Sequence, residues 1–305
     1  MSETIARDAS GERTIVVTGV HGQVGFELLR SLQGLGRVVG MSRDALDLSR
    51  PDAIRSCIRS LRPAVIVNAA AYTAVDRAEQ DVDSARMINA EAPAVLAEEA
   101  RRSGALLIHY STDYVFDGAL ARPYIEDDAT VPLNIYGVTK RDGELAIVAA
   151  GCAHLIFRTS WVYGRRGGNF LTTMLRLSNE RDELRIVADQ VGAPTWSATI
   201  ATLTAHVLSQ GVASQVGLSA WGAELSGIYH MSAAGSTSWA GFAEHIFAVA
   251  APARVPAIVP IPAIEYPTLA KRPANSRLDT SKLQRAFSLT PPQWDDALAL
   301  CVASM

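Results

Sequence analysis

Tyr136 and Lys140 are the two residues whose types and spacing best suit proton-transfer chemistry, since they stand four positions apart in Tyr-Gly-Val-Thr-Lys. On a helix, residues four apart lie on one face. A phenol has an ordinary pKa of about 10, and a nearby cation favours its ionised form, which brings proton exchange towards working pH. Such a match is common by itself, because a half-buried tyrosine beside a solvated lysine gives the same pattern. Its interpretation depends on the elements around it.

Short β-branched runs alternate with longer helical patterns from Thr14 onward, which is typical of βαβ units wound into a parallel sheet. We expect strands at 14–18, 37–41, 64–68, 105–110 and 155–159, and helices at 23–33, 51–61, 87–103 and 136–150. The predicted fold class is α/β, a Rossmann-type doubly wound parallel sheet. Its fourth strand leads into Ser111-Thr112-Asp113, which places a hydroxyl at the carboxyl edge of the sheet, where ligands bind.

The regular alternation ends after Trp161, where several glycines interrupt it. We expect four parts along the chain: a flexible extension at 1–13, a cofactor-binding domain at 14–165, a helix near 196–225 that returns to that domain, and a smaller α/β substrate lobe formed by 166–195 and 226–305. Within this lobe we expect strands near Ile228 and Ile258 and helices near Trp239 and Ser281.

A glycine-rich turn, Thr18-Gly-Val-His-Gly-Gln-Val-Gly, separates the first expected strand from the first helix. Gly19, Gly22 and Gly25 are spaced three apart, as a tight turn that lets a pyrophosphate approach the backbone requires. The free N-terminus of the helix favours negative charge. Because strand, glycines and helix come in the required order, the turn predicts a dinucleotide site.

The second expected strand ends in Met41-Ser42-Arg43, where many dinucleotide folds carry an acid that holds the adenosine ribose. A hydroxyl beside a guanidinium suits a 2′-phosphate better, so the sequence favours NADPH and leaves NADH possible. Asp44 weakens this electrostatic argument. Asp47 and Leu48 are candidates for the adenine pocket.

Composition excludes several classes of partner. The formal net charge of -3, with both signs interspersed, predicts neither nucleic-acid nor membrane-surface binding. No apolar run approaches the roughly 18 to 20 residues of a membrane span, and residues 1–13 lack the apolar run of a signal peptide. Cys57, Cys152 and Cys301 lack the spacing of a metal site or a disulfide framework. We therefore expect a cytoplasmic protein that binds a small molecule.

Together these motifs resemble the extended short-chain dehydrogenase/reductase superfamily. Further blocks narrow the resemblance to the dTDP-4-dehydrorhamnose reductase family; they lie at 68–76, 110–118, 132–137, 158–163, 189–195 and 272–278. The likeness runs from about Thr14 to the C-terminus. The last two blocks are informative because related sugar-nucleotide enzymes diverge in the substrate lobe.

The resemblance implies a reduction in which hydride from NADPH reaches C4 of dTDP-4-dehydro-L-rhamnose and dTDP-L-rhamnose is formed. It implies that Tyr136 is the proton donor, Lys140 its electrostatic partner, and Thr112 the hydroxyl that orients the carbonyl. The implied cofactor contacts comprise the glycine turn with Gln23 and Val24, the turn formed by Ala70, Ala71, Tyr72 and Thr73, and Tyr110. The implied substrate contacts are Val75, Thr112, Asp113 and Trp161.

Some members of this family join two subunits through carboxylates around Mg²⁺. Glu27 and Asp295 suit such an arrangement, but the position aligned with a third acid is Ala198. A hard cation needs several oxygen ligands, which disfavours a metal-bridged dimer here and leaves a metal-free homodimer or a monomer open.

Two other functions stay open at this point. One is a sugar-nucleotide epimerase or dehydratase of the same fold, which keeps its cofactor tightly bound and needs no added NADPH. The other is a non-catalytic NADP-binding regulatory subunit, against which the presence of Thr112, Tyr136 and Lys140 argues.

Overall fold

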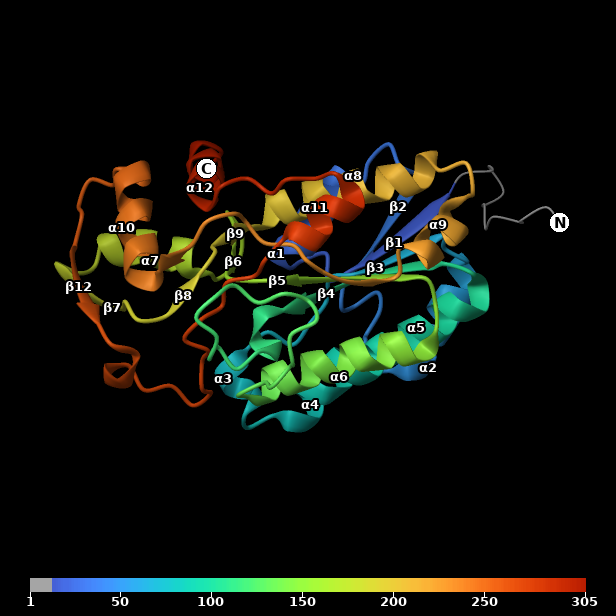
Figure 1. The fold of residues 1–305 in the computed structure, drawn as a ribbon, viewed down its shortest axis with the longest axis horizontal. Helices are drawn as coiled ribbons and strands as arrows, with labels where there is room; N and C mark the ends of the chain where they lie inside the picture. The colour runs from blue at the N-terminus through green and yellow to red at the C-terminus, as the bar shows by residue number, and fades with distance from the viewer. Residues whose placement is uncertain (1–12) are drawn as a thin grey trace.

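The computed structural model describes residues 13–305 and is built on a six-stranded sheet (Figure 1). In sheet order its strands are β10 (Gly227–His230), β5 (His154–Thr159), β4 (Leu106–Thr112), β3 (Val65–Asn68), β1 (Thr14–Thr18) and β2 (Arg37–Met41). Every neighbouring pair is parallel. Because β1 lies between β2 and β3, crossovers leave in opposite directions from it, and this switch point is where doubly wound sheets bind ligands. The expected Rossmann-type fold is confirmed.

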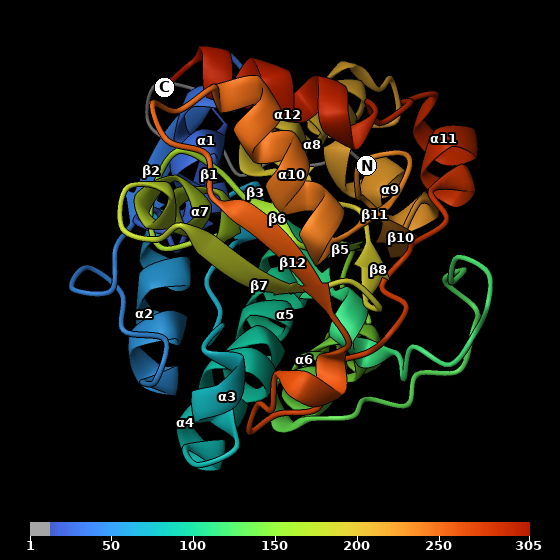
Figure 2. The ribbon, with the colours of Figure 1, turned by 90° about the vertical axis from the view of Figure 1, so that its left-hand side faces the viewer.

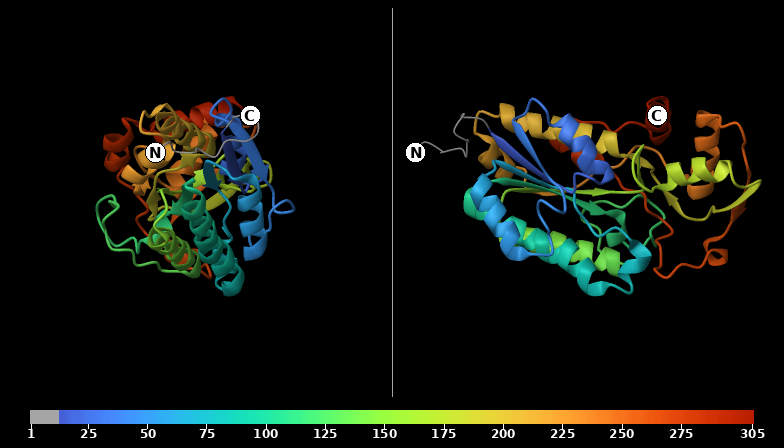
Figure 3. Two further views of the ribbon diagram at one scale, coloured as in Figure 1. Left: turned by 90° about the vertical axis from the view of Figure 1, so that its right-hand side faces the viewer. Right: turned by 180° about the vertical axis from the view of Figure 1, so that it is seen from behind.

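Helices cover both faces of the sheet, which is why every residue of its inner strands β5, β4, β3 and β1 is buried (Figures 1 and 3). One face carries α1 (Gln23–Ser31), α8 (Ser197–Ala213), α9 (Leu218–Glu224) and α11 (Ser281–Phe287). The other carries α2 (Pro51–Leu61), α5 (Ala92–Ser103) and α6 (Ile135–Ala150). The sheet is thus a rigid platform whose carboxyl edge presents the loops of the site.

The segment between β3 and α5 is more broken than expected. It contains α3 (Val75–Ala78), α4 (Val82–Arg86) and a π-helical turn, η1 (Met87–Glu91), that runs into α5. The predicted helix at 87–103 therefore starts with one wider turn. A π-turn inserts an extra residue into a helix and often marks a functional position. Here it contains the buried Asn89.

A smaller set of elements lies beyond the carboxyl edge of the sheet, facing the viewer in Figure 2. Its strands form three pairs: β6 (Val162–Tyr163) with β9 (Thr195–Trp196), β7 (Glu183–Val187) with β12 (Ala257–Ile261), and β8 (Val191–Gly192) with β11 (Thr237–Ser238). Its helices are α7 (Phe170–Ser178), α10 (Trp239–Ala250), α12 (Trp294–Ala303) and the short η3 (Ala263–Glu265). Helices α7, α10 and α12 share an apolar core with β6 and β7, centred on Tyr163, Leu171, Phe242 and Leu298.

Two elements do not lie where the sequence analysis placed them. The strand near Ile228 and the helix near Ser281 were assigned to the substrate lobe, within 226–305. Instead, β10 pairs with β5 as the sixth strand of the central sheet, and α11 packs beside it, with Phe287 in the core of the main domain. Apolar side chains at Tyr229 and Phe287 explain this return. The other domain boundaries stay predictions.

The predicted flexible extension at 1–13 lies outside the described residues except for Arg13. Within 13–305, no helix is both long and apolar enough to span a membrane. All three cysteines are free thiols.

Candidate active site

The glycine turn forms a close-fitting cradle at the start of α1. Gly19 has φ +69°, and its carbonyl oxygen accepts a hydrogen bond from the amide of Gly22 at 2.9 Å. A Cβ at Gly25 would lie 2.2 Å from that same oxygen, so only glycine fits there. Gly22 caps α1 without a side-chain hydrogen bond, and the first turn of the helix has no acidic residue. Free amides and an unopposed helix dipole fit a pyrophosphate.

The turn after β2 lies level with this cradle, since Thr18 is in register with Met41. The Ser42 hydroxyl accepts a hydrogen bond from the amide of Ala45 and so shapes the turn, while Arg43 is exposed. Asp47 is held by the amide and hydroxyl of Ser49, which lowers the pKa of its carboxyl. The exposed guanidinium of Arg43, next to the cradle, fits a 2′-phosphate.

The turn after β3 is fixed by a residue that the sequence analysis missed. The side chain of Asn89 accepts a hydrogen bond from the amide of Tyr72 at 2.8 Å and donates one to its carbonyl at 3.1 Å. It also donates to the Thr139 hydroxyl on α6 at 3.1 Å. Asn89 thereby ties the turn containing Ala70–Thr73 to the helix that carries Tyr136 and Lys140. In the sequence, the only indication of this role is that Asn89 is a polar residue in a helical segment that packs against the core.

Tyr136 and Thr112 meet at the carboxyl edge of β4. The half-buried Tyr136 is a hydrogen-bond partner of Thr112, whose hydroxyl also donates to Asp113 at 3.1 Å. Burial raises the pKa of Tyr136 to about 12, against the lowering effect of the Thr112 hydrogen bond. The phenol is therefore protonated at neutral pH, as a proton donor must be.

Lys140 is buried on the same helix, with only 1 % of its surface exposed. Its amine donates to the carbonyl oxygen of Tyr110 at 2.6 Å and contacts Nε2 of His109 at 3.1 Å. Burial lowers the pKa of Lys140 to about 8, and the carboxylate of Glu144, one turn along, opposes this effect. Tyr110 meets this site through its backbone, because its hydroxyl bonds to Thr204 of α8 at 2.7 Å.

The start of α6 is fixed from three sides. The side chain of Asn134 accepts a hydrogen bond from the amide of Gly137 and donates to the carbonyl of Lys271, each at 2.8 Å. Glu79, which follows α3, accepts a hydrogen bond from the amide of Ile135 at 2.8 Å. Such a cap fixes the first turn of the helix, and hence Tyr136, relative to β4.

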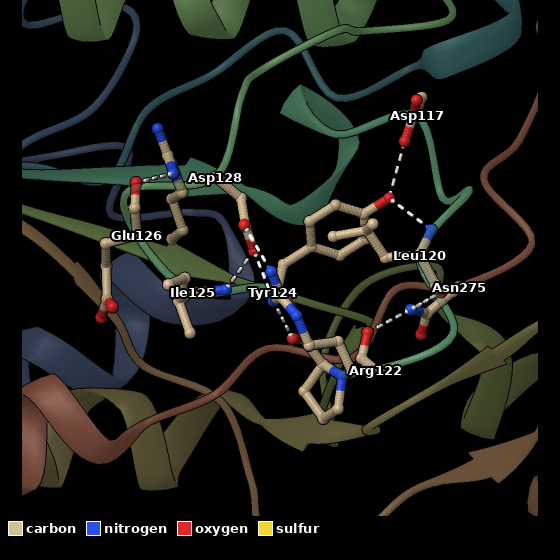
Figure 4. A network of polar contacts seen from close by, with 10 residues as sticks. Asp117, Leu120, Arg122, Tyr124, Ile125, Glu126, Asp128 and Asn275 are labelled. Atoms are coloured by element: carbon tan, nitrogen blue, oxygen red, sulfur yellow. Dashed lines mark hydrogen bonds and ion pairs between the residues drawn. The ribbon is translucent and has the colours of Figure 1, made fainter.

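The long loop before α6 is held by its own polar contacts and by the C-terminal segment (Figure 4). The Tyr124 hydroxyl donates to Asp117 at 2.6 Å, and Arg122 forms two 2.7 Å contacts with Asp128. Asn275 donates to the carbonyls of Leu120 and Arg122. The loop and the block at 272–278 are therefore one unit beside the site.

Trp161 lies two residues after the end of β5 in a strained conformation, with φ +47°. This left-handed region is rare for bulky residues and often marks a functional position. Its indole stacks on Trp239 at 3.6 Å and 7°, and packs so closely on Gly192 that a Cβ there would lie 2.5 Å from the ring. Trp239, also missed from the sequence, fixes the orientation of Trp161 from the smaller lobe.

Asp113 is a buried carboxyl group with one oxygen free of partners. Burial raises its pKa to about 6, although Ser276 and Thr112 donate hydrogen bonds to it. A free oxygen at this edge is suited to accept a hydrogen bond from a sugar hydroxyl. Val75 lies at the first position of α3, half-buried.

The raised pKa of Asp113 predicts a pH-dependent stability. Between about pH 4 and 6 the native state holds a proton that the unfolded chain has released, so the free energy of unfolding falls as pH rises through this window. Asp113→Asn is expected to remove this contribution, which amounts to at most ~1.4 kcal/mol per pH unit. Urea unfolding of both proteins from pH 4.5 to 7.5 measures the difference. Parallel pH profiles would refute it.

Comparison with known proteins agrees with this geometry. The family model described as RmlD substrate binding domain matches residues 13–305. The chain is 52% identical to dTDP-4-dehydrorhamnose reductase of Burkholderia thailandensis over 95% of its own length and 98% of the relative. It belongs to the dTDP-4-dehydrorhamnose reductase family. The enzyme of that name from Escherichia coli K12 is 44% identical, over 92% of this chain and 94% of the relative.

A solved structure of the same reductase family has the same fold. The crystal structure of dTDP-4-dehydrorhamnose reductase from Bacillus anthracis in complex with NADP has a TM-score of 0.88 and 32% identity, covering 96% of this chain and all of that one. The family resemblance drawn from the sequence is thus confirmed. The individual site residues stay predictions.

Metal binding stays untested. Within residues 13–305, no three His, Cys, Asp or Glu side chains gather as a metal site would require, and neither Glu27 nor Asp295 belongs to such a group. A site shared between two copies would need ligands from both, so Mg²⁺ and a homodimer stay predictions.

Proposed function

We propose that the protein reduces dTDP-4-dehydro-L-rhamnose to dTDP-L-rhamnose with NADPH. The observation that carries this proposal is the protonated Tyr136 beside Thr112 at the carboxyl edge of the sheet, the same edge at which β1 leads into the glycine cradle. Membership of the family and the NADP complex of the Bacillus anthracis relative support the substrate and the cofactor.

The residues take separate parts in this reaction. The cradle of Gly19, Gly22 and Gly25 with Gln23 and Val24 would hold the pyrophosphate, and the turn of Ala70–Thr73 would line the rest of the cofactor site. Bound NADPH supplies the hydride. Thr112 would orient the C4 carbonyl, and Tyr136 would protonate O4 as the carbon is reduced. Lys140 would hold the cofactor ribose through its free N–H.

Asp113 and Trp161 would bind the sugar nucleotide. The free oxygen of Asp113 accepts a hydrogen bond, and the indole of Trp161 offers an apolar face with one N–H donor. Because Trp239 fixes that indole, the two lobes must be close together for this part of the site to exist.

The decisive experiment follows NADPH oxidation with dTDP-4-dehydro-L-rhamnose and identifies the product by mass and NMR. Stoichiometric oxidation with dTDP-L-rhamnose as product is expected. Conversion of a sugar nucleotide without net NADPH oxidation would indicate an epimerase or dehydratase instead. Binding of NADPH without any turnover would indicate a regulatory subunit.

Cofactor preference gives a separate prediction. Arg43→Ala is expected to raise the Kd for NADPH by about tenfold, as the loss of a charge-assisted hydrogen bond does, and to leave the Kd for NADH nearly unchanged. Fluorescence titration measures both constants. Arg30→Ala is the matched control, because Arg30 is an exposed arginine in the last turn of α1, away from the cradle. Equal effects of Arg43→Ala on both cofactors would remove the reason for preferring NADPH.

A further inference from the structure

A chain of buried polar side chains runs across the sheet and ends at Lys140. It starts at the Thr18 hydroxyl on β1, which lies 2.6 Å from Oδ1 of Asn68 on β3. The side-chain nitrogen of Asn68 lies 3.0 Å from Nδ1 of His109 on β4, and the other ring nitrogen of His109 lies 3.1 Å from the amine of Lys140. All four side chains are at most 1 % exposed. The proposed reaction uses only the last of these four side chains, Lys140.

Burial of four polar side chains in the core is costly unless each is hydrogen-bonded. The three residues that precede His109 in β4, which are Leu106, Leu107 and Ile108, are all fully buried. An apolar residue at position 109 would suit this core better by itself. The presence of a histidine at this position is therefore explained by its polar contacts, which are Asn68 on one side of the ring and Lys140 on the other.

The protonation states follow from counting donors. An ammonium at Lys140 has three N–H donors. One goes to the carbonyl of Tyr110, one points at Nε2 of His109, and one is left for a ligand. Nε2 then accepts, so the neutral ring must carry its hydrogen on Nδ1 and donate to Asn68. Burial and the nearby Lys140 charge lower the pKa of His109 well below its usual value, which keeps the ring neutral.

The amide of Asn68 must match this direction. A half-turn of the amide exchanges its oxygen and nitrogen without moving either position, and the two orientations differ only in hydrogen bonding. With the oxygen towards His109, every donor in the chain points from Lys140 towards Thr18. With the nitrogen towards His109, the ring carries its hydrogen on Nε2 and would need a lone pair on a neutral Lys140. The direction of the chain therefore reports the charge on the lysine.

We propose that His109 is a positioning residue that holds the Lys140 ammonium by accepting its hydrogen bond at Nε2, with Asn68 and Thr18 fixing the ring behind it. This arrangement aims the remaining N–H of Lys140 away from the core and towards the site. The catalytic consequence rests on the proposed function, because only there does the lysine act on cofactor and phenol. The hydrogen bonds between His109 and Lys140 do not depend on the proposed function.

Other charged and titratable groups around Lys140 are accounted for. Glu144, on the same helix, forms a bidentate ion pair with Arg158 of β5 at 2.9 and 2.7 Å. Tyr136, one turn earlier on α6, is protonated. Asp113, which directly follows β4, acts on Tyr136 through its charge. Within the described residues, His109 is thus the titratable side chain in direct contact with the amine.

Histidine NMR tests the arrangement directly. In the full-length protein with uniform ¹⁵N-histidine labelling at pH 7, the two ring nitrogens of His109 are expected to show a neutral tautomer protonated on Nδ1. His109→Gln assigns the signals, because it removes that ring alone among six histidines. A ring protonated on Nε2 would overturn the proposal.

Titration of Lys140 gives a second test, and it is simplified by the presence of only three lysines, Lys140, Lys271 and Lys282. With ¹³C-labelled lysine, His109→Leu is expected to lower the pKa of Lys140 by about one unit, since the ammonium loses one acceptor. His109→Gln keeps a carbonyl oxygen at similar reach and should restore most of the shift. An unchanged Lys140 titration in His109→Leu would refute the role of the ring.

Two further variants test whether the shift is specific to the contact between His109 and Lys140. His154→Leu removes another buried histidine, which contacts the carbonyl of Cys152, and is expected to leave the Lys140 titration unchanged. Asn68→Leu leaves His109 in place but frees its tautomer, so a smaller shift in the same direction is expected if His109→Leu does not fold. No shift in Asn68→Leu would then contradict the proposal.

Activity distinguishes the failure of the two proposals. If the protein reduces the 4-keto sugar, the alkaline limb of kcat should move to lower pH by the same amount in His109→Leu, because loss of the lysine charge then occurs earlier. If it does not reduce that sugar but the Lys140 titration shifts as expected, the proposed function is wrong and the positioning role stands.

Discussion

Replacing Tyr136 by phenylalanine is expected to lower the turnover of dTDP-4-dehydro-L-rhamnose by at least about a hundredfold, since general acid catalysis contributes about 10² to 10⁴. The phenol lies against Thr112, and its raised pKa keeps it protonated for donation. Phenylalanine keeps the ring and its edge-to-face contact with Tyr114, at 5.6 Å between ring centroids, so the site should retain its shape. The Kd for NADPH is expected to stay within about twofold.

Stopped-flow or steady-state NADPH oxidation measures this loss, and fluorescence titration measures cofactor binding. Tyr163→Phe is the matched control, because the Tyr163 hydroxyl is buried in the core of the smaller lobe without a hydrogen-bond partner among the described residues. That variant should turn over normally. Wild-type turnover in Tyr136→Phe would refute the assignment of the proton donor. A combined loss of turnover and NADPH binding would instead indicate a disrupted site.

Much of the fold was predictable because its signals are local. Each strand of the first half is a short apolar run, and each crossover helix has a clear boundary, such as Pro51 at the start of α2. The helix at Pro51–Leu61 was predicted to the residue. By contrast, β10 lies about 70 residues beyond β5 in the chain, and only tertiary packing joins them. The sequence of a strand as short as β10 does not indicate which sheet the strand joins.

The candidate site shows the same division. Motifs at one place in the chain, such as the glycine turn and Tyr136-x-x-x-Lys140, were visible because their spacing carries the chemistry. His109, Asn89 and Trp239 were missed because each acts on a residue from another element. In the sequence, such a residue can be noticed only as a polar side chain inside an apolar strand or helix. Which residue it contacts can be known only from the fold.

The buried ion pair behind the site should have the largest effect on stability. Arg158 and Glu144 are each about 3 % exposed and bind through two hydrogen bonds, at 2.9 and 2.7 Å. Arg158→Met is expected to lower the free energy of unfolding by about 3–5 kcal/mol, because it leaves the Glu144 carboxylate buried and unpaired. The loss of the guanidinium contact with the Phe116 ring, at 5.0 Å, acts in the same direction. Chemical denaturation measures the change.

The double variant Arg158→Met with Glu144→Leu tests the physical reason. Once both charges are gone, no unpaired group is left in the core, and most of the lost stability should return. Arg176→Met breaks an ion pair with Glu180 whose side chains are 59% and 46% exposed, and its effect should be much smaller because water screens and solvates both groups. If the double variant were as unstable as Arg158→Met, packing of the arginine, rather than the unpaired carboxylate, would be the cause. Since Glu144 is one turn from Lys140 on α6, the double variant should also lower the pKa of that lysine, which links the core ion pair to the site it supports.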